Sequence, residues 1–329
     1  MGDRRACWVV LAGRTTLQRP HFHFERPAMI DPLSEVVALL QPTARFSKLL
    51  EGAGHWRIRR EGLGEPFYGA MLEGECRLSV EGRAPIILQA GDFVLVPAMH
   101  NLVNTSVHAG HDADEEVTAP VQIGEGHFRM GRLEGPVESR MQIGHCQFGS
   151  PDAALLVSLL PHVVHVRDEP RLAALVQMVG DEARAQRPAR EVILERLLEV
   201  LLIEALRSHS GTTDASGLVR GLADERLAVA LRALHARPHH PWTVVELAAE
   251  AALSRSAFFA RFTRTLGIAP MEYLLAWRMA LAKRLLRDRD LSLEQVAERV
   301  GYATANTFGV AFARHVGMSP ARYAREGMA

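Results

Sequence analysis

The pattern of apolar and polar positions divides the chain into a strand-rich first part and a helical second part. Between residues 67 and 96, short apolar segments are separated by glycines, and residues 76–80 alternate apolar and polar. This period of two, interrupted by glycine turns, is typical of half-buried antiparallel strands. From Pro151 onward, apolar residues recur every three or four positions instead, which predicts helices.

The strand-rich part predicts a small antiparallel sandwich or barrel, preceded by one helix. That helix is expected over residues 31–40, where Pro32 occupies the first turn. The segment from 104 to 138 is polar and rich in His, Asp and Gly, so we expect a long loop there. Strands are expected at 67–72, 76–80, 86–88, 93–96 and 141–148, of which the last would close a barrel.

A helical middle follows. Helices are expected over residues 153–160 and 171–185, and a strongly apolar helix is expected over 191–206. A helix with so wide an apolar surface is buried. It packs either on the barrel of its own chain or in a subunit interface, and both alternatives stay open. The segment 208–221 contains Ser, Gly and Thr and predicts an interdomain linker.

The C-terminal part contains an internal repeat. Thr243 and Ser292 each begin a capping box, in which a hydroxyl is followed three residues later by Glu or Gln, and each box predicts a helix start. Small residues and a Gly-x-x-Pro terminator follow each box, shifted by 49 or 50 positions between the copies. Because chance rarely matches these features in one order, two similar helix pairs are expected, over 243–266 and 292–316.

Each helix pair has the layout of a helix-turn-helix, whose second helix enters the DNA major groove. Phe258 and Phe262 in the first pair, like Phe308 and Phe312 in the second, lie four residues apart and are expected to face the core. A long helix over 271–287 connects the pairs.

The distribution of net charge along the chain agrees with a polyanion partner for the C-terminal part. Residues 223–329 have 15 Lys and Arg against 10 Asp and Glu, or +5, which leaves 23 against 28, or −5, for the rest of a neutral chain.

Residues at the start of each second helix, off the phenylalanine face, are the candidate base contacts. Arg suits guanine and Asn suits adenine, and each good pair contributes roughly 1–3 kcal/mol of discrimination. The candidates are Ser254, Arg255, Ser256 and Phe259 in the first pair and Thr304, Ala305 and Asn306 in the second. Candidate phosphate contacts, which orient a protein on DNA, are Arg261, Arg264, Arg278 and Arg314. The alternatives are solvated surface charge for the arginines and simple packing for Phe259.

These features resemble the DNA-binding domain of AraC/XylS-type transcription regulators. The matching residues are Trp277-Arg278, Val300-Gly301-Tyr302, Phe308, Phe312, Gly317, Ser319-Pro320 and Tyr323. The resemblance implies seven helices, with two recognition helices in successive major-groove segments of double-stranded DNA. It also implies promoter regulation, more often activation, with RNA polymerase as a partner. Ala260 and Val310 stand where the family often has basic residues, so we expect fewer polar contacts to DNA.

Residues 31–165 resemble the cupin-like sensor domains attached to many such regulators. The matching residues are Leu72-Glu73-Gly74, Gly91-Asp92, Val96-Pro97, His100, His145-Cys146 and Leu159-Leu160-Pro161. The resemblance implies an interior pocket for an unknown small-molecule effector. Candidate lining residues near strand ends are His55, Trp56, Tyr68 and His100. Cys146 beside His145 is a candidate redox sensor if its pKa is lowered, and a buried structural cysteine is the alternative.

Many cupins are metalloenzymes, so a cupin enzyme with an accessory DNA-binding tail is the second hypothesis. The sequence offers one plausible motif ligand, His100, where about three convergent ligands are normally needed. A solvated loop is expected for the remaining candidates, His108, His111, Asp112, Asp114 and His127. No metal, other cofactor or catalytic residue is therefore predicted, and a regulator is favoured over an enzyme.

The predicted fold class is α+β with several domains: an N-terminal antiparallel cupin-like β-barrel, a helical middle and an all-α domain with two helix-turn-helix motifs. The expected segments are a poorly ordered tail (1–28), sensor domain (29–165), coupling or dimerisation segment (166–210), linker (211–222) and DNA-binding domain (223–329). Met29 is the suspected natural start. Three cysteines without paired spacing, and no apolar run near the roughly 18 residues of a membrane span, predict a cytoplasmic protein. A homodimer is among the expected assemblies, and no membrane partner is expected.

Overall fold

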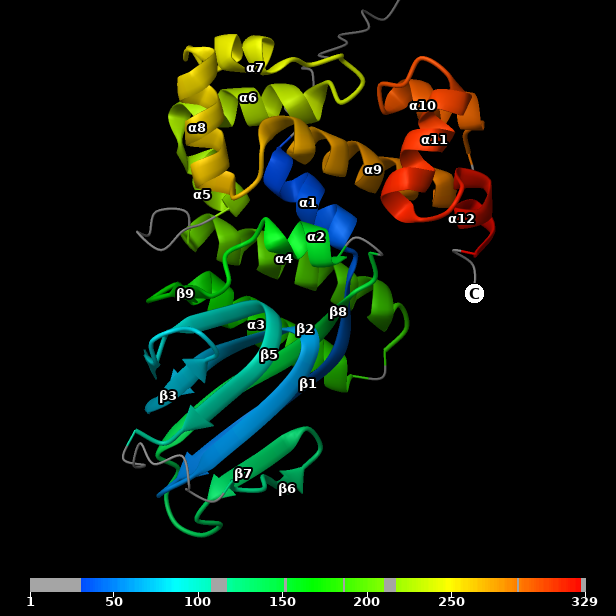
Figure 1. Ribbon diagram of the computed structural model, residues 1–329. Helices are drawn as coiled ribbons and strands as arrows, with labels where there is room; N and C mark the ends of the chain where they lie inside the picture. The colour runs from blue at the N-terminus through cyan, green and yellow to red at the C-terminus, as the bar shows by residue number, and fades with distance from the viewer. Residues whose placement is uncertain are drawn as a thin grey trace, which may run out of the picture.

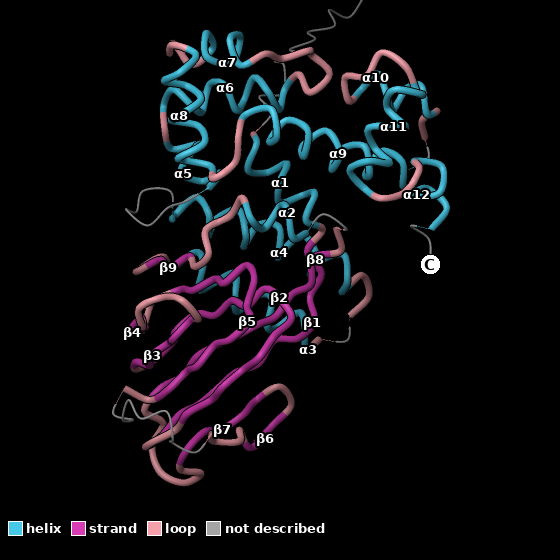
Figure 2. Tube along the Cα trace, viewed as in Figure 1, coloured by secondary structure: helices cyan, strands magenta, loops and turns pink. Residues whose placement is uncertain are grey.

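The computed structural model describes residues 31–107, 117–150, 153–185, 187–209, 217–288 and 290–326. The expected tail 1–28 and the suspected start at Met29 lie outside these residues. Figure 1 shows a β-sheet at one end of the molecule and a group of helices at the other, with α1, α2 and α4 between them. The same division is visible in Figure 2, where strands and helices hardly mix.

One sheet contains all the strands of the described part of the chain. Its order is β4-β3-β5-β2-β8-β1-β7-β6, and the short β9 pairs with β5. Most neighbours are antiparallel, and β1 with β7 is a parallel pair. The strands are β1 (Pro42–Ala53), β2 (Arg57–Glu73), β3 (Glu75–Val80), β4 (Ile86–Gln89), β5 (Phe93–Thr105), β6 (Val121–Gly124), β7 (His127–Gly131), β8 (Ser139–Phe148) and β9 (Val164–Val166).

The expected barrel is wrong, because the sheet is not closed. β8 was expected to close a barrel, but it lies inside the sheet, where it pairs with β2 on one side and β1 on the other. The long strands β2 and β5 pair along most of their length, with register shifts between Glu61 and Phe67. Part of the expected loop over 104–138 is also strand, since β5 extends to Thr105 and β6 and β7 form a hairpin.

The two faces of the sheet bury different clusters of apolar side chains. One face, with Tyr68 and Cys146, packs against four helices in a core that continues to the helical end of the molecule. These helices are α1 (Pro32–Leu40), α2 (Ala153–Ser158), α3 (Pro170–Arg184) and α4 (Arg190–His209). The opposite face buries a second cluster that includes Trp56, Phe67 and Met99.

Helix α4 packs inside its own chain, which is one of the two alternatives for the strongly apolar segment. Leu194, Leu198 and Leu202 are buried in the core shared by the sheet and the helical end. The helix still exposes Val192 and Ile193, so part of its apolar surface is uncovered. None of the helices in the described residues is long and apolar enough to cross a membrane.

The helical end is built from α5 to α12. Residues 217–222 of the expected linker form most of the short helix α5. The helices are α5 (Gly217–Ala223), α6 (Glu225–Ala236), α7 (Val244–Glu250), α8 (Arg255–Leu266), α9 (Pro270–Asp288), α10 (Leu293–Arg299), α11 (Ala305–Val316) and α12 (Pro320–Glu326). The first part of α9 joins the core of α6–α8, and its second part joins a separate core with α10–α12. In Figure 1, α9 runs between the two groups.

Candidate DNA-binding surface and sensor cavity

Helices α8 and α11 begin and end in the same way. Both capping boxes are confirmed, one at Thr243 before α7 and one at Ser292 before α10. Ser254 caps α8, since its Oγ accepts a hydrogen bond from the Ala257 N–H at 3.3 Å. Thr304 caps α11 through an equivalent bond of 3.1 Å from the Thr307 N–H to its Oγ1. Each helix ends at a glycine in the left-handed region. The repeat in sequence is therefore a repeat in local structure.

Buried phenylalanines fix which side of α8 faces solvent. Phe258 and Phe262 are buried and their ring centroids lie 5.5 Å apart. The helical period then turns Arg255, Ser256 and Phe259 outward, and all three are exposed. Phe259 is 45% exposed. This aromatic side chain lies on the surface and not in the core.

Helix α11 repeats this arrangement with different surface residues. Phe308 and Phe312 are buried, with ring centroids 5.4 Å apart. Asn306 is exposed and Ala305 half-buried at the start of the helix. Val310 is 66% exposed, so α11 presents an apolar side chain to solvent at that position. The two helices therefore present similar geometry with different chemistry.

The four candidate arginines fall into two groups. Arg264 and Arg314 are exposed and form no ion pair with any residue the structure describes. Arg261 donates to the Asp224 carboxylate, with Nε 2.7 Å from Oδ2. Arg278 donates from Nε to the Pro238 carbonyl at 2.7 Å and from Nη2 to the His240 carbonyl at 2.8 Å. The last two arginines therefore have structural partners inside the domain.

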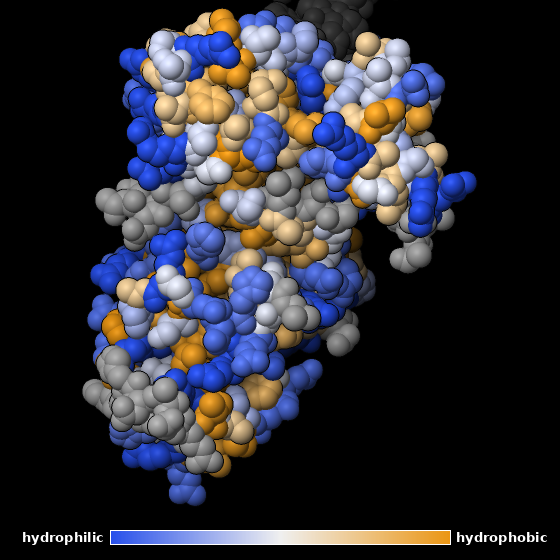
Figure 3. All heavy atoms as spheres, viewed as in Figure 1, coloured by the Kyte–Doolittle hydropathy of each residue, from blue (hydrophilic) through white to orange (hydrophobic). Residues whose placement is uncertain are grey.

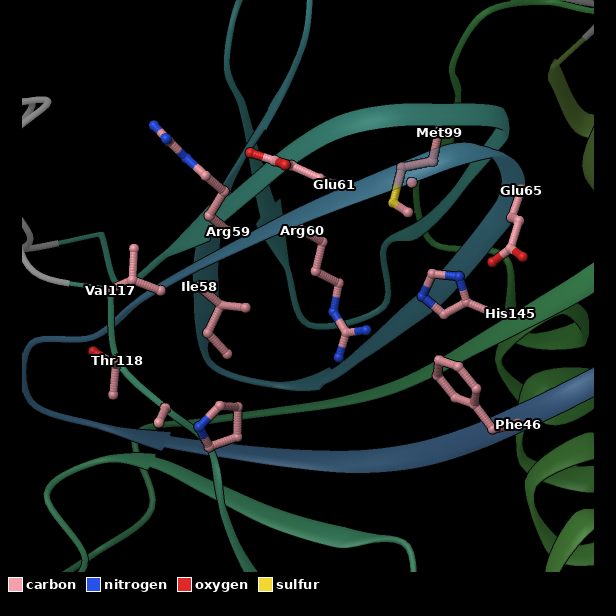
Figure 4. A pocket seen from close by; sticks show the side chains of 13 residues that line it. Phe46, Ile58, Arg59, Arg60, Glu61, Glu65, Met99, Val117, Thr118 and His145 are labelled. Carbon is pink, nitrogen blue, oxygen red and sulfur yellow. The ribbon is translucent and has the colours of Figure 1, made fainter.

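A cavity of about 460 Å³ lies against the face of the sheet that α3 and α4 leave uncovered, beneath residues 117–120. Figure 4 shows Arg60, His145 and Phe46 directed toward one another across it, from β2, β8 and β1. Arg59 and Glu61 also line the cavity, but their side chains leave β2 on the other side from Arg60, because neighbours in a strand alternate between faces. Ile58 and Met99 add apolar surface. None of these residues was a predicted ligand contact.

His145 is enclosed within this group. Its ring centroid lies 4.6 Å from that of Phe46 and 5.3 Å from that of Phe67. Burial, and then the positive charges of Arg60, Lys48 and Arg45, lower the pKa of His145 to about 4. The imidazole is therefore neutral near pH 7, with one nitrogen that donates and one that accepts.

The four predicted ligand residues do not converge. His55 is exposed after β1, and Trp56 is buried in the cluster on the cavity side of the sheet. Tyr68 is buried on the opposite side, in the core shared with the helices. His100 lines a different cavity, of about 640 Å³, between the sheet and α2. Arg60 was missed because no strand was expected over its segment; once β2 begins at Arg57, the strand period of two places Ile58 and Arg60 on one face.

The structure corrects the expected chemistry of Cys146. Its thiol is fully buried on the helix side of the sheet, and burial raises its pKa to about 12. His145 was expected to lower that pKa, but successive strand residues point to opposite faces, so its ring lies on the cavity side. Cys146 has the environment of a core cysteine.

No group of three or more His, Cys, Asp or Glu residues with metal-ligand geometry occurs within the described ranges. His108, His111, Asp112 and Asp114 lie outside those ranges. The fifth loop candidate, His127, is within 3.1 Å of the Glu51 carboxylate, which also receives Arg129 and Arg140.

A polar network joins the sheet part of the molecule to the helical end. The His235 ring on α6 lies within hydrogen-bonding distance of Glu35 on α1 and Tyr273 on α9. Helices α1, α6 and α9 pack together at this junction. Figure 3 shows hydrophobic residues at the surface between the two ends of the molecule.

Comparisons with known proteins match both parts of the chain. A cupin family model matches residues 31–211 and a helix-turn-helix domain model matches residues 247–326. A putative AraC-like transcription regulator from Streptomyces lividans is 35% identical over 308 residues, or 89% of this chain and 98% of that protein. The HTH-type transcriptional regulator AlkR from Acinetobacter baylyi is 32% identical over 277 residues, or 78% of this chain and 86% of that protein. The DNA-binding domain of AdpA, solved in complex with a target DNA, is 37% identical and covers 31% of this chain and 88% of that structure, with a TM-score of 0.28.

Proposed function

We propose that this chain, which belongs to the AraC family of transcription regulators, reads promoter DNA with α8 and α11 and couples that reading to an effector held in its cupin domain. Helices 166–210 would form the coupling or dimerisation segment between the sensor domain, 29–165, and the DNA-binding domain, 223–329. The exposed Val192, Ile193 and Val200 on α4 support a homodimer contact, since apolar side chains gather at such interfaces.

The observation that carries the proposal is that α8 and α11, the second helices of the two pairs, expose their first turns in the same way. Each begins at a hydroxyl cap, buries two phenylalanines and exposes polar side chains in its first turn. Two helix-turn-helix motifs of this kind, joined by α9, are suited to successive major-groove segments of one DNA face. One chain would therefore contact two successive major-groove segments of its DNA site.

The base contacts differ between the helices. Arg255 on α8 has the donors for guanine O6 and N7, and Asn306 on α11 suits adenine N6 and N7. Phe259 and Ala305 would contact thymine methyls. Ser254, Ser256 and Thr304 add hydroxyl groups at the two helix starts.

Phosphate contacts orient this arrangement. Arg264 and Arg314 are exposed and form no ion pair with other described residues, so their charges are available. Arg278 is a weaker candidate, because two of its nitrogens already donate to the carbonyls of Pro238 and His240. Its role in DNA binding would be to position the loop after α6.

Activation through RNA polymerase is the proposed direction of regulation. Relatives that cover most of the chain are named as transcription regulators, which favours regulation of transcription, in either direction, over the activity of a cupin enzyme. Metal analysis of the purified protein tests the enzyme alternative, since stoichiometric Fe, Mn, Ni or Zn would revive it. Transcription in vitro with and without the protein tests the direction.

DNA binding itself is tested by fluorescence anisotropy with the full chain. A duplex selected from a random pool is compared with a shuffled duplex of the same composition. We expect selective binding whose affinity falls steeply between roughly 50 and 200 mM salt, because bound phosphates release counterions. Affinity that ignored both sequence and salt would contradict the proposal.

A further inference from the structure

The cavity side of the sheet carries cations without anionic partners. Arg60 points into the cavity and forms no ion pair within the described residues. Lys48, on β1, likewise has no carboxylate partner there. Its ammonium lies 4.6 Å from the Phe46 ring centroid and 4.7 Å from that of Phe128. Burial of the ammonium, and then the charge of Arg60, lower the pKa of Lys48, so the two cations are close enough to repel each other.

The carboxylates near the cavity do not offset these charges. Glu65 is paired with Arg45. Glu61 also lines the cavity, but it is exposed and its side chain is directed away from Arg60. This side of the sheet therefore has two half-buried cations without a paired carboxylate, and an anion that entered the cavity would offset their charge.

His145 adds a second, independent observation. Its side chain is 2% exposed, and both ring nitrogens are buried without a hydrogen-bond partner. A buried polar group normally has such a partner, and an unpaired one costs roughly 1–3 kcal/mol. The ring lines the cavity, where its nitrogens could bond to a group that enters.

The walls beside these polar groups are apolar. Phe46, Ile58 and Met99 line the same cavity. Its volume of about 460 Å³ is that of a small-molecule site. An apolar wall next to a guanidinium and a neutral imidazole suits a molecule with an anionic head and an apolar body.

We propose that this cavity binds a small organic carboxylate, whose carboxylate group accepts hydrogen bonds from Arg60 and His145 beside the charge of Lys48 and whose apolar body contacts Phe46, Ile58 and Met99. A guanidinium presents two parallel N–H donors that match a carboxylate. Inorganic phosphate would leave the apolar walls without a partner. This inference rests on the proposed sensor function and names the chemical class of its effector.

The test measures binding of 2-naphthoate to the full chain by the fluorescence of the probe. Its uncharged amide, 2-naphthamide, and inorganic phosphate are used as competitors. We expect saturable 2-naphthoate binding that neither competitor displaces at equal concentration. Arg60→Gln is expected to weaken binding about tenfold or more, because it removes charge-assisted hydrogen bonds.

Further variants separate recognition from folding. Lys48→Met and His145→Phe are each expected to weaken binding severalfold. Arg83→Gln, at an exposed arginine after β3 that does not line this cavity, is the charge-matched control with an unchanged dissociation constant. Circular dichroism establishes that each variant is folded. Equal binding of naphthoate and naphthamide, displacement by phosphate, unchanged binding in Arg60→Gln, or no binding of naphthoate would each overturn the proposal. DNA anisotropy on the same samples is independent of this result, so failure of carboxylate binding is distinguishable from failure of the DNA-binding function.

Discussion

The Nδ1 atom of His235 lies 2.8 Å from Oε2 of Glu35, which joins α6 of the helical end to α1 at the start of the sheet part. The other ring nitrogen, Nε2, lies 2.7 Å from the Tyr273 hydroxyl on α9. The ring centroid of Trp277 is 4.0 Å away. One fully buried imidazole therefore connects three helices from both ends of the molecule. A change in the sheet part that moves α1 would reach α6 and α9 directly.

Replacement of His235 by phenylalanine should reduce the stability of this junction. The aromatic volume is kept, but Glu35 and the buried Tyr273 hydroxyl each lose a partner. We expect a loss of about 1–3 kcal/mol in the free energy of unfolding, measured by urea denaturation. His315→Phe, on the exposed side of α11, is the control, with an expected change within about 0.5 kcal/mol. Equal effects of the two substitutions would contradict the role of the network.

Stability should fall as the pH is lowered from neutral. Burial lowers the pKa of His235, and burial with the charges of Arg60, Lys48 and Arg45 lowers the pKa of His145 from its ordinary 6.5 to about 4. Between those two pH values the unfolded chain binds more protons than the folded chain, so protonation favours unfolding. The stability that the neutral His145 contributes is fully present above pH 6.5 and is lost progressively as the pH falls toward 4.

The thermal midpoint, measured from pH 7.5 to pH 5 in roughly half-unit steps, tests this dependence. His145→Gln should make the decline shallower, since it removes one of the two groups. His55→Gln, at an exposed position, serves as the control and should keep the slope of the original chain. A slope that His145→Gln left unchanged would show that this histidine does not contribute.

Two glycines of the second helix pair, one between α10 and α11 and one at the end of α11, should differ in tolerance to alanine. Gly301 (φ +82°) and Gly317 (φ +83°) both adopt the left-handed region, where a side chain costs roughly 1–2 kcal/mol. A Cβ at Gly301 would lie 2.5 Å from Arg278 Nη2 and 2.8 Å from the His239 carbonyl oxygen, whereas one at Gly317 would meet nothing within 4 Å. Gly301→Ala should therefore lower the free energy of unfolding by about 1–3 kcal/mol more than Gly317→Ala, as measured in urea. Equal losses would mean that the Arg278 side chain moves aside at no cost.

The helices of the helical end could be predicted from the sequence because the signals for their starts and buried faces are local. The caps at Thr243, Ser254, Ser292 and Thr304 each depend on residues within one turn, and the phenylalanine spacing sets the buried face. Phe259 and Asn306 are therefore exposed as expected.

The sheet was harder to predict, because its order depends on contacts between distant residues. The sheet would close into a barrel only if its edge strands β4 and β6 paired with each other, and this pairing cannot be predicted from the residues of either strand alone. The charged start of β2 hides a strand, since Arg57, Arg59 and Arg60 interrupt the apolar alternation. Arg60 and His145 meet only after β2 and β8 pair, 85 positions apart in sequence. The cavity was therefore missed for the same reason as the sheet order.

The two reading helices should contribute unequally to sequence recognition. Arg255 is exposed in the first turn of α8 beside Phe259, whereas the surface of α11 continues from Asn306 to the exposed valine Val310. The first exposed basic side chain of α11 is Arg314, near its end. We therefore expect charged base contacts from α8 only, and we expect Asn306 to make the strongest polar base contact of α11.

Arg255→Ala should therefore cost more specificity than any single substitution in α11 except Asn306→Ala. Each of these two changes should remove about 1–3 kcal/mol of discrimination at one base pair, because a bidentate contact to a base edge is lost. The measurement is anisotropy with the selected duplex and with single-base variants of it. Arg232→Ala, at an exposed arginine on α6, is the charge-matched control and should weaken all duplexes equally or not at all. If Arg255→Ala also weakened every duplex by the same factor, Arg255 would be a phosphate contact, and base recognition by α8 would rest on Phe259 and its neighbours.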